Sequence, residues 1–212
     1  SKGHDIRISG ELAGPMRAEE FEKNGEPVNR LQAIKPIIQA FIEQRPADRI
    51  GIVLFSGRAY TMAPLTFDHD WLSRQLERLK LGMLENGTAI GDGLGVALTR
   101  LEQAKRQAGG QRQGAFVVLM TDGVNNSGAM TPEQATALAK ARGIPVLLTG
   151  MKASPNLGPD YMARFDAIYP DLARSHDLLL LCPYLAQFRN LPICLCQTCL
   201  PYISVTPLYH PL

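Results

Sequence analysis

The stretch GTAIGDGLGVALTRLEQAKRQAGGQRQGAFVVLMTDGVNNSG, residues 87–128, contains the pattern that decides the fold. Within it, residues 115–120 (AFVVLM) form a continuous apolar run that stops at Thr121-Asp122-Gly123. A short, valine-containing apolar run bounded by glycine is typical of a strand buried on both faces of a parallel sheet. Asp122 is therefore expected at the carboxyl end of a strand, the edge of an open α/β sheet where ligands bind.

An amphipathic helix is predicted before this strand. Arg100, Glu102 and Lys105 fall on its polar side, and the apolar residues recur at helical spacing: Ile90, Leu94, Ala97, Leu98 and Leu101. Gly87-Thr88 stands where this helix opens. Thr88 is thus expected at a helix N-terminus, and Asp122 at a strand end.

The rest of the chain up to residue 149 alternates between strand and helix patterns. The expected elements are a strand at 6–12, a helix at 30–44 capped by Asn29, strands at 49–55 and 59–62, a helix at 68–81, a helix from Thr131 to Arg142 and a strand at 144–149. Pro36 should kink the first helix or remove one of its hydrogen bonds. This alternation predicts a doubly wound, mostly parallel sheet with helices on both faces, a three-layer α/β/α domain.

Composition excludes several classes of protein. The 212 residues are 45% hydrophobic and 20% charged, which fits one α/β domain, or one domain and an appendage, rather than a disordered chain. A formal net charge of +2 without a basic stripe gives no case for nucleic acid. The N-terminal residues SKGHD lack the apolar segment of a signal peptide, which by itself favours the cytoplasm but does not fix the compartment.

Thr88 in GTAIGDGL and Asp122 in LMTDGVNN resemble the second and third parts of the metal-ion-dependent adhesion site of von Willebrand factor A (VWA) domains. The likeness is to bacterial VWA proteins of the aerotolerance-operon type, whose members are commonly membrane-associated. It extends over NRLQA at 29–33, DRIGIVLF at 48–55 and APLTFDH at 63–69, and covers about residues 3–143. The resemblance implies a non-enzymatic module that binds a protein partner at the carboxyl edge of the sheet. The residues expected to bind the partner are Gly87, Thr88, Asp122, Gly123 and Asn125.

The first part of the family's metal site, Asp-x-Ser-x-Ser, differs in this chain. Glu11, Ala13 and Pro15 occupy the three positions, so the implied ligand set is Glu11, Thr88 and Asp122. Magnesium requires near-octahedral oxygen coordination, and neither Ala13 nor Pro15 has a side-chain oxygen. Mg²⁺ is therefore expected to bind weakly or not at all. A simple role as a turn residue before Gly123 stays open for Asp122.

Residues 140–181 resemble a late strand and helix of SGNH-family esterases. Residues 143–181 could thus be a grafted β-α unit within a domain spanning 1–181. The catalytic blocks of that family are missing, because Gly93 in GDGL stands where its serine should be and Asp171 and His176 have the wrong spacing. An SGNH-type hydrolase therefore remains an alternative to the VWA module, and a composite chain without a selected activity is a third interpretation.

Residues 182–212 form an apolar tail rich in proline, with Arg189 as its one charged residue. It holds all four cysteines, Cys182, Cys194, Cys196 and Cys199, whose spacing lacks paired Cys-x-x-Cys motifs. Free thiols in a poorly specified tail are favoured over a metal or redox cluster. The prolines and Arg189 interrupt any run of about 20 apolar residues, so no membrane span is predicted there.

Several polar residues receive ordinary structural roles from the sequence. Asn125 and Asn126 are interpreted as loop residues, and Arg49, Arg58 and Lys80 as solvated charges. The sequence does not set the oligomeric state.

Overall fold

The computed structural model describes residues 3–12, 16, 21–23, 26–107, 114–121, 125–150, 158–176 and 178–181. Its strands are β1 (Asp5–Glu11), β2 (Phe21–Lys23), β3 (Glu26–Val28), β4 (Arg49–Phe55), β5 (Ala59–Thr66), β6 (Ala115–Met120), β7 (Val146–Thr149) and β8 (Leu179–Leu181). Its helices are α1 (Arg30–Glu43), α2 (His69–Glu77), α3 (Ile90–Gln107), α4 (Pro132–Ala141) and α5 (Pro159–His176).

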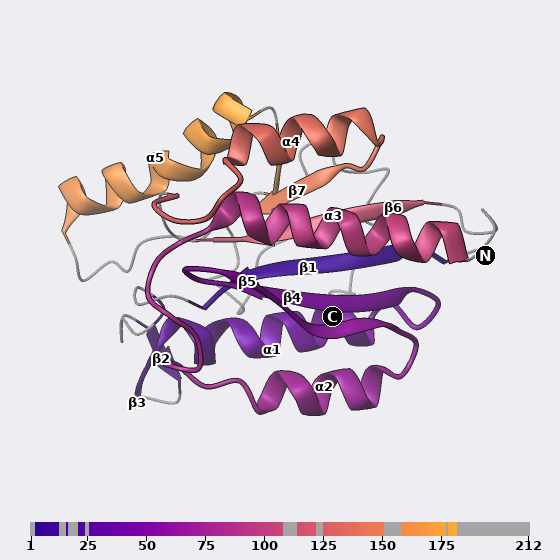
Figure 1. The fold of residues 1–212 in the computed structure, drawn as a ribbon. Coiled ribbons are helices and arrows are strands. Elements are labelled where there is room, and N and C mark those ends of the chain that lie inside the picture. The colour runs from indigo at the N-terminus through magenta and orange to yellow at the C-terminus, as the bar shows by residue number, and fades with distance from the viewer. Residues whose placement is uncertain are drawn as a thin grey trace, which may run out of the picture.

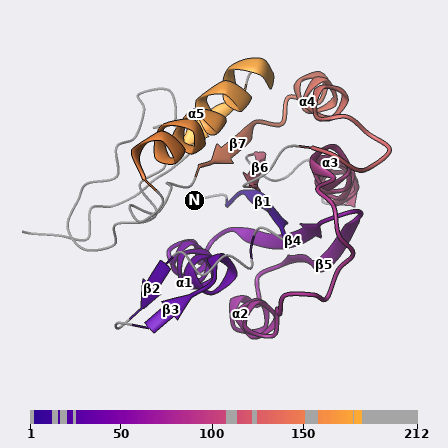
Figure 2. The same cartoon turned by 90° about the vertical axis from the view of Figure 1, so that its left-hand side faces the viewer.

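Six of these strands form one sheet in the order β5-β4-β1-β6-β7-β8. All neighbouring strands are parallel except β4 and β5, which are antiparallel. Helices α3, α4 and α5 pack on one face of this sheet and α1 and α2 on the other. In Figure 1, α4 and α5 lie at the top of the view, α1 and α2 at the bottom and α3 between them. The view turned by 90° shows α1 and α3 on opposite sides of β1 and β4 (Figure 2). The predicted doubly wound, mostly parallel three-layer fold is confirmed.

Each face of the sheet packs a separate hydrophobic core. Ile6 and Ile8 of β1 join the core under α1 and α2, whereas Val117 and Leu119 of β6 join the core under α3, α4 and α5. Side chains alternate along a strand, so the other residues of β1 face α3. These are Asp5, Arg7, Ser9 and Glu11, and all four are buried. The central strand therefore has one apolar face and one polar face inside the protein.

Local hydrogen bonds fix the starts of two helices as the sequence predicts. At α1, Gln32 N donates to Asn29 Oδ1 (2.9 Å) and Asn29 N donates to Gln32 Oε1 (3.0 Å). At α4, Thr131 and Gln134 make the same reciprocal pair, with Pro132 in the first turn. These capping boxes satisfy backbone donors that have no partner inside the helix.

Other boundaries differ from the prediction. Strand β5 extends beyond 59–62 and includes Pro64, which an edge strand tolerates because one side of its backbone needs no partner. Helix α2 ends at Glu77 rather than 81, where Lys35 Nζ donates to the carbonyls of Glu77 (2.8 Å) and Leu79 (2.6 Å). Helix α1, in contrast, keeps its predicted range apart from one residue and contains Pro36, which has no N–H to donate, as expected. The antiparallel strands β2 and β3, which flank Asn24-Gly25 in the sequence, were not predicted.

The described residues between 143 and 181 add two more strands and a helix to the sheet. Strand β7 pairs with β6 and strand β8 with β7, both in parallel register. Helix α5 packs on the same core as α3 and α4, with Tyr169 and Ala173 buried and Met162, Ile168 and Leu172 partly buried. The boundary at residue 181 stays a prediction, because residues 182–212 lie outside the described part. Among the described helices, none is both long and apolar enough to cross a membrane.

Candidate functional site

Glu11 is the last residue of β1 and lies at the carboxyl edge of the sheet, opposite Phe55 of β4. The residue is only 2% exposed. Glu11 Oε1 accepts a hydrogen bond from the Thr88 hydroxyl (2.8 Å), and Oε2 accepts one from the Thr121 hydroxyl (2.6 Å). One side chain of β1 thus connects the segment before α3 with the residue that follows β6. We call Glu11, Thr88 and Thr121 the edge triad.

The N-terminus of α3 is capped by other loops of the same edge. Thr88 N donates to Asn126 Oδ1 (2.9 Å), Ala89 N to the Ser56 carbonyl (2.7 Å) and Ile90 N to Asn125 Oδ1 (2.8 Å). The first N–H groups of a helix have no acceptor within the helix, so these bonds supply the missing partners. Asn125 and Asn126, interpreted from the sequence as loop residues, are therefore capping residues of α3. No local sequence signal indicates this role, because the acceptors lie 35 and 38 residues from the donors.

Asp92 in the first turn of α3 holds the segment that leads to α4. Its Oδ1 accepts from Met130 N (2.8 Å), and both of its oxygens accept from Ala129 N (3.1 and 3.2 Å). The neighbouring glycines allow this close approach. A Cβ on Gly91 would lie 2.0 Å from the Met130 carbonyl oxygen, and one on Gly93 would lie 2.5 Å from the Phe55 ring. The GDGL sequence therefore has a packing role in this helix.

The predicted partner-binding residues differ in their accessibility. Thr88 is buried at 4% exposure and its hydroxyl is bound to Glu11, while Gly87 and Asn125 are half-buried. Gly87 has a φ of 118°, and a Cβ there would lie 2.4 Å from the Ser127 hydroxyl, so only glycine fits this turn. Asp122 and Gly123 lie outside the described residues. Thr121, which precedes them, was not among the site residues predicted from the sequence.

The described residues of this edge do not by themselves form a magnesium site, and Asp122, the third predicted ligand, lies outside them. Magnesium needs roughly six oxygens and keeps several waters, whereas Glu11, Thr88 and Thr121 are 2%, 4% and 1% exposed, which leaves little room for a hydrated ion. Both carboxylate oxygens of Glu11 already accept hydroxyl groups. Within the described part, no group of three or more His, Cys, Asp or Glu residues is placed to hold a metal. Ala13 and Pro15, which are outside that part, have no side-chain oxygen to add.

Charged groups at the opposite, amino end of the sheet are structural. Arg49 of β4 donates two hydrogen bonds to Asp5 of β1 (2.8 and 2.6 Å), so the interpretation of Arg49 as a solvated charge was wrong. The bond to Asp5 raises the pKa of Arg49. Arg58, in contrast, is an exposed residue that approaches the exposed Glu85 at 3.5 Å.

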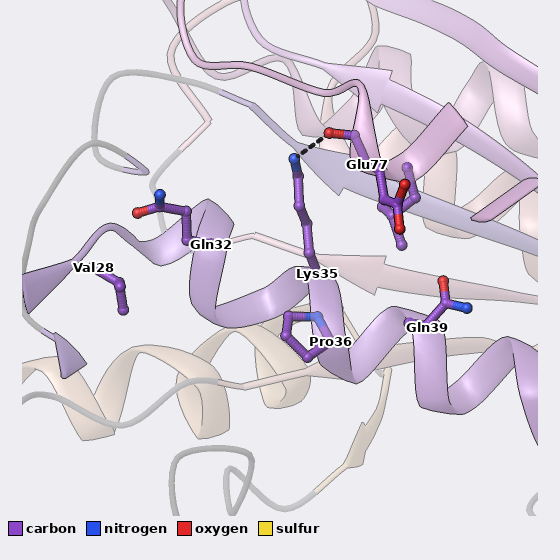
Figure 3. A pocket seen from close by; sticks show the side chains of 7 residues that line it. Val28, Gln32, Lys35, Pro36, Gln39 and Glu77 are labelled. Atoms are coloured by element: carbon purple, nitrogen blue, oxygen red, sulfur yellow. Dashed lines mark hydrogen bonds between the residues drawn. The ribbon is translucent and has the colours of Figure 1, made fainter. Parts of the chain in front are cut away.

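A groove of about 380 Å³ lies between α1 and α2, and its described lining does not include Glu11, Thr88 or Thr121. It is lined by Val28, Gln32, Lys35, Pro36, Gln39, Leu76 and Glu77 (Figure 3). The Lys35 amine is directed at the end of α2, where it donates to the Glu77 carbonyl. Burial lowers the pKa of Lys35. Lys35 is thus already used as a helix cap.

The fold and the edge triad define an α/β domain whose polar site lies at the carboxyl edge of a mostly parallel sheet. A family model described as von Willebrand factor type A domain matches residues 14–125, just over half of the chain. The chain belongs to the von Willebrand factor A family. This confirms the family predicted from the sequence.

Individual relatives are consistent with this assignment. An uncharacterized protein of Borreliella burgdorferi is 30% identical over 169 residues, which cover 80% of this chain and 47% of that protein. The chain thus spans about half the length of this curated relative. An aerotolerance-related membrane protein from Bacteroides fragilis, solved with multiple mutations to serines, matches with a TM-score of 0.58 and 18% identity, over 85% of this chain and 90% of that one.

Two further solved structures share the fold. The conserved hypothetical protein BatB from Bacteroides thetaiotaomicron matches with a TM-score of 0.57 and 19% identity, over 85% of this chain and 89% of that one. Proximal thread matrix protein 1 from the mussel byssus, in a structure with a zinc-occupied MIDAS motif, matches with a TM-score of 0.56 and 24% identity, over 72% of this chain and 37% of that one. At these identities the likeness shows the fold alone.

Proposed function

We propose that this chain is a non-enzymatic protein-binding module that contacts its partner with the carboxyl edge of the sheet, and that a divalent cation contributes little to this binding. Membership of the VWA family supports the first part, because such domains commonly mediate protein interactions. The chemistry of Glu11, Ala13 and Pro15 supports the second part.

One observation carries the proposal: the loops of the carboxyl edge are bound to one another before any partner arrives. Asn125 and Asn126 cap α3, the backbone after β4 accepts from Ala89, and Asp92 holds the segment before α4. A surface that is already ordered loses less conformational entropy on binding, so more of its contact energy appears as affinity. The partner's contacts then fall on the accessible residues of this edge, such as Asn126 and Asn86.

The same chemistry sets the kind of affinity expected. In the family, a carboxylate of the partner completes the coordination shell of the metal. This chain has two fewer hydroxyl ligands and an internal carboxylate bound by two threonines. Shape and hydrogen bonds at the edge, rather than an ion bridge, would then carry the affinity.

A photo-crosslinking experiment tests the binding surface. A photoreactive amino acid replaces Asn86, an exposed residue whose carbonyl lies beside Gly57 at this edge, or Arg74, an exposed residue of α2 that serves as the control. We expect a crosslinked protein from cells of the source organism with the Asn86 probe and not with the Arg74 probe. Equal capture by both positions, or capture by Arg74 alone, would contradict the proposal.

Thermal unfolding tests the metal part. The parent and Asp122→Ala are unfolded with and without millimolar magnesium or manganese, since a ligand that binds only the folded state raises its stability. We expect no response from either protein. A gain of several degrees by the parent but not by Asp122→Ala would show a working metal site despite Ala13 and Pro15.

The SGNH-type hydrolase and the composite chain stay as alternatives that other assays separate. Gly93 is packed against Phe55, so a serine nucleophile at this position would be buried. Hydrolysis of a p-nitrophenyl ester that survives Asp122→Ala would favour the hydrolase. A chain without a selected activity predicts neither turnover nor a crosslinked partner.

A further inference from the structure

We propose that the Glu11 carboxylate is an internal tie that holds β1, β6 and the start of α3 together at the carboxyl edge, so that their alignment needs no divalent cation. This inference deepens the proposed function, because the edge that Glu11 aligns is the proposed binding surface. Glu11 is a positioning residue in this account. It acts through Thr88 and Thr121 and not by touching a partner.

The strand register brings Glu11 and Thr121 together. Gly10 of β1 pairs with Met120 of β6, so the next residues along these parallel strands, Glu11 and Thr121, are neighbours on the same face of the sheet. Their side chains meet at 2.6 Å. This distance lies in the range of hydrogen bonds from a hydroxyl to a charged carboxylate, about 2.5 to 2.7 Å.

Thr88 approaches the same carboxylate from the helix layer. Thr88 comes two residues before α3, and its hydroxyl lies 2.8 Å from the second oxygen of Glu11. Its backbone N–H is bound to Asn126, and its carbonyl accepts from Asn126 N (3.0 Å) and Ser127 N (3.3 Å). Thr88 therefore connects Glu11 by hydrogen bonds to Asn126 and Ser127, in the loop after β6.

The length of the Glu11 side chain explains how one carboxylate can serve two hydroxyls. Glutamate carries its carboxylate one methylene further from the backbone than the aspartate that the family has at this position. That methylene lets the two oxygens reach a hydroxyl from the neighbouring strand and one from the helix layer at once. Aspartate at position 11 would draw the charge back and leave it buried with fewer donors, which is costly.

The test compares the unfolding temperature and amide exchange of Glu11→Asp, Glu11→Gln and Thr121→Val. Glu43→Asp, the same shortening at an exposed position of α1, is the matched control. We expect Glu11→Asp to lower the unfolding temperature by roughly 5 to 10 °C and Glu43→Asp to leave it unchanged. We expect a smaller loss for Glu11→Gln, because the amide keeps the length of the side chain and can still bond both hydroxyls.

Local amide exchange separates an edge tie from general destabilisation. The N–H groups of Ala89 and Asn126 bond across the edge, whereas Leu72 N bonds to the Asp68 carbonyl at the start of α2. We expect faster exchange at Ala89 and Asn126 in Glu11→Asp, and unchanged exchange at Leu72. In the parent protein, these rates should be the same in millimolar magnesium and in EDTA.

Two results would overturn the inference: a Glu11→Asp variant as stable and as protected as Glu43→Asp, or a parent protein that loses protection at Ala89 and Asn126 in EDTA. If Glu11→Asp does not fold, Thr121→Val carries the test, since it removes one of the two bonds and keeps the shape of the side chain. Unchanged exchange at both amides in Thr121→Val would then overturn it. No partner is present in these measurements. A negative result here would therefore overturn the role of Glu11 without testing the proposed function, which the crosslinking experiment tests separately.

Discussion

Replacing Arg7 with methionine should make the protein more stable. Arg7 lies in the middle of β1 on its polar face and is 3% exposed. Its Nη1 donates to the Ala63 carbonyl of β5 (2.7 Å), whereas its Nε is a buried atom without a hydrogen-bond partner in the described structure. The guanidinium lies over Gly51, where a Cβ would be 2.4 Å from Nη1. A methionine is an apolar chain long enough to occupy much of this space.

The expected gain follows from the unfavourable surroundings of the charge. Burial, followed by repulsion from Arg100, lowers the pKa of Arg7 to about 10, although Asp5 acts in the opposite direction. A lowering of this size corresponds to roughly 3 kcal/mol against the charged form in the folded state. Losing the bond to Ala63 costs about 1 kcal/mol. The net gain of about 2 kcal/mol would raise the unfolding temperature by roughly 4 to 8 °C.

Urea unfolding of Arg7→Met and the parent at neutral pH measures this difference. Arg74→Met makes the same replacement at an exposed position of α2 and should change stability by less than about 0.5 kcal/mol. The lowered pKa of Arg7 also predicts how the stability difference between Arg7→Met and the parent changes with pH. Because the pKa of Arg7 is lowered by folding, the penalty is complete below about pH 10 and is lost as the pH rises towards the value of the unfolded chain. The advantage of Arg7→Met should therefore shrink above about pH 10.

A lower urea midpoint for Arg7→Met than for the parent would refute this reasoning. It would mean that the bond to Ala63 and the attraction to Asp5 outweigh the cost of burying the guanidinium. An advantage of the same size for Arg74→Met would also refute it, since the gain would then not come from burial.

Three further substitutions probe the packing and the caps. Gly91→Ala should cost more than about 3 kcal/mol in urea unfolding, because its Cβ would lie 2.0 Å from the backbone oxygen of Met130; a change below about 1 kcal/mol would contradict this. Asn126→Ala should cost about 1 kcal/mol and speed amide exchange at Thr88, whose N–H loses its acceptor; unchanged exchange would speak against the cap. Pro36→Ala should raise the unfolding temperature by a few degrees, since an exposed proline inside α1 is replaced by the best helix former, and a lower temperature would show that Pro36 stabilises the fold.

Features that depend on neighbouring residues were predicted well. The N-caps at Asn29 and Thr131 depend only on residues within three positions, so the sequence shows them directly. The buried strand at 115–120 is visible as an uninterrupted apolar run. Such signals are local, and tertiary packing did not override them.

Features that depend on distant residues were missed. Arg49 was interpreted as a solvated charge because its partner, Asp5, lies 44 residues away on the neighbouring strand. The caps from Asn125 and Asn126 to the start of α3 have the same origin. For the site, the family resemblance placed Glu11 and Thr88 together, which the structure shows at 2.8 Å. Thr121 was overlooked because the resemblance directs attention to the aspartate that follows it.

The polar face of β1 contains both a residue whose partner the sequence analysis missed and a residue of the proposed site. Asp5, at the amino end, is bound by Arg49 of the next strand, and Glu11, at the carboxyl end, is bound by Thr88 and Thr121. Arg7, in the middle, has a pKa lowered mainly by burial. Donors from loops and helix N-termini converge at the end of a parallel strand and not at its centre, so a buried carboxylate is stabilised there. The loops and helix N-termini that meet at this end of the sheet can surround a cation with oxygen ligands. They can equally surround the carboxylate of a glutamate, which is longer than an aspartate, with hydroxyl groups. A change from aspartate to glutamate, together with loss of the two serines, could therefore convert an ion-bridged edge into one held by its own side chains without altering the sheet.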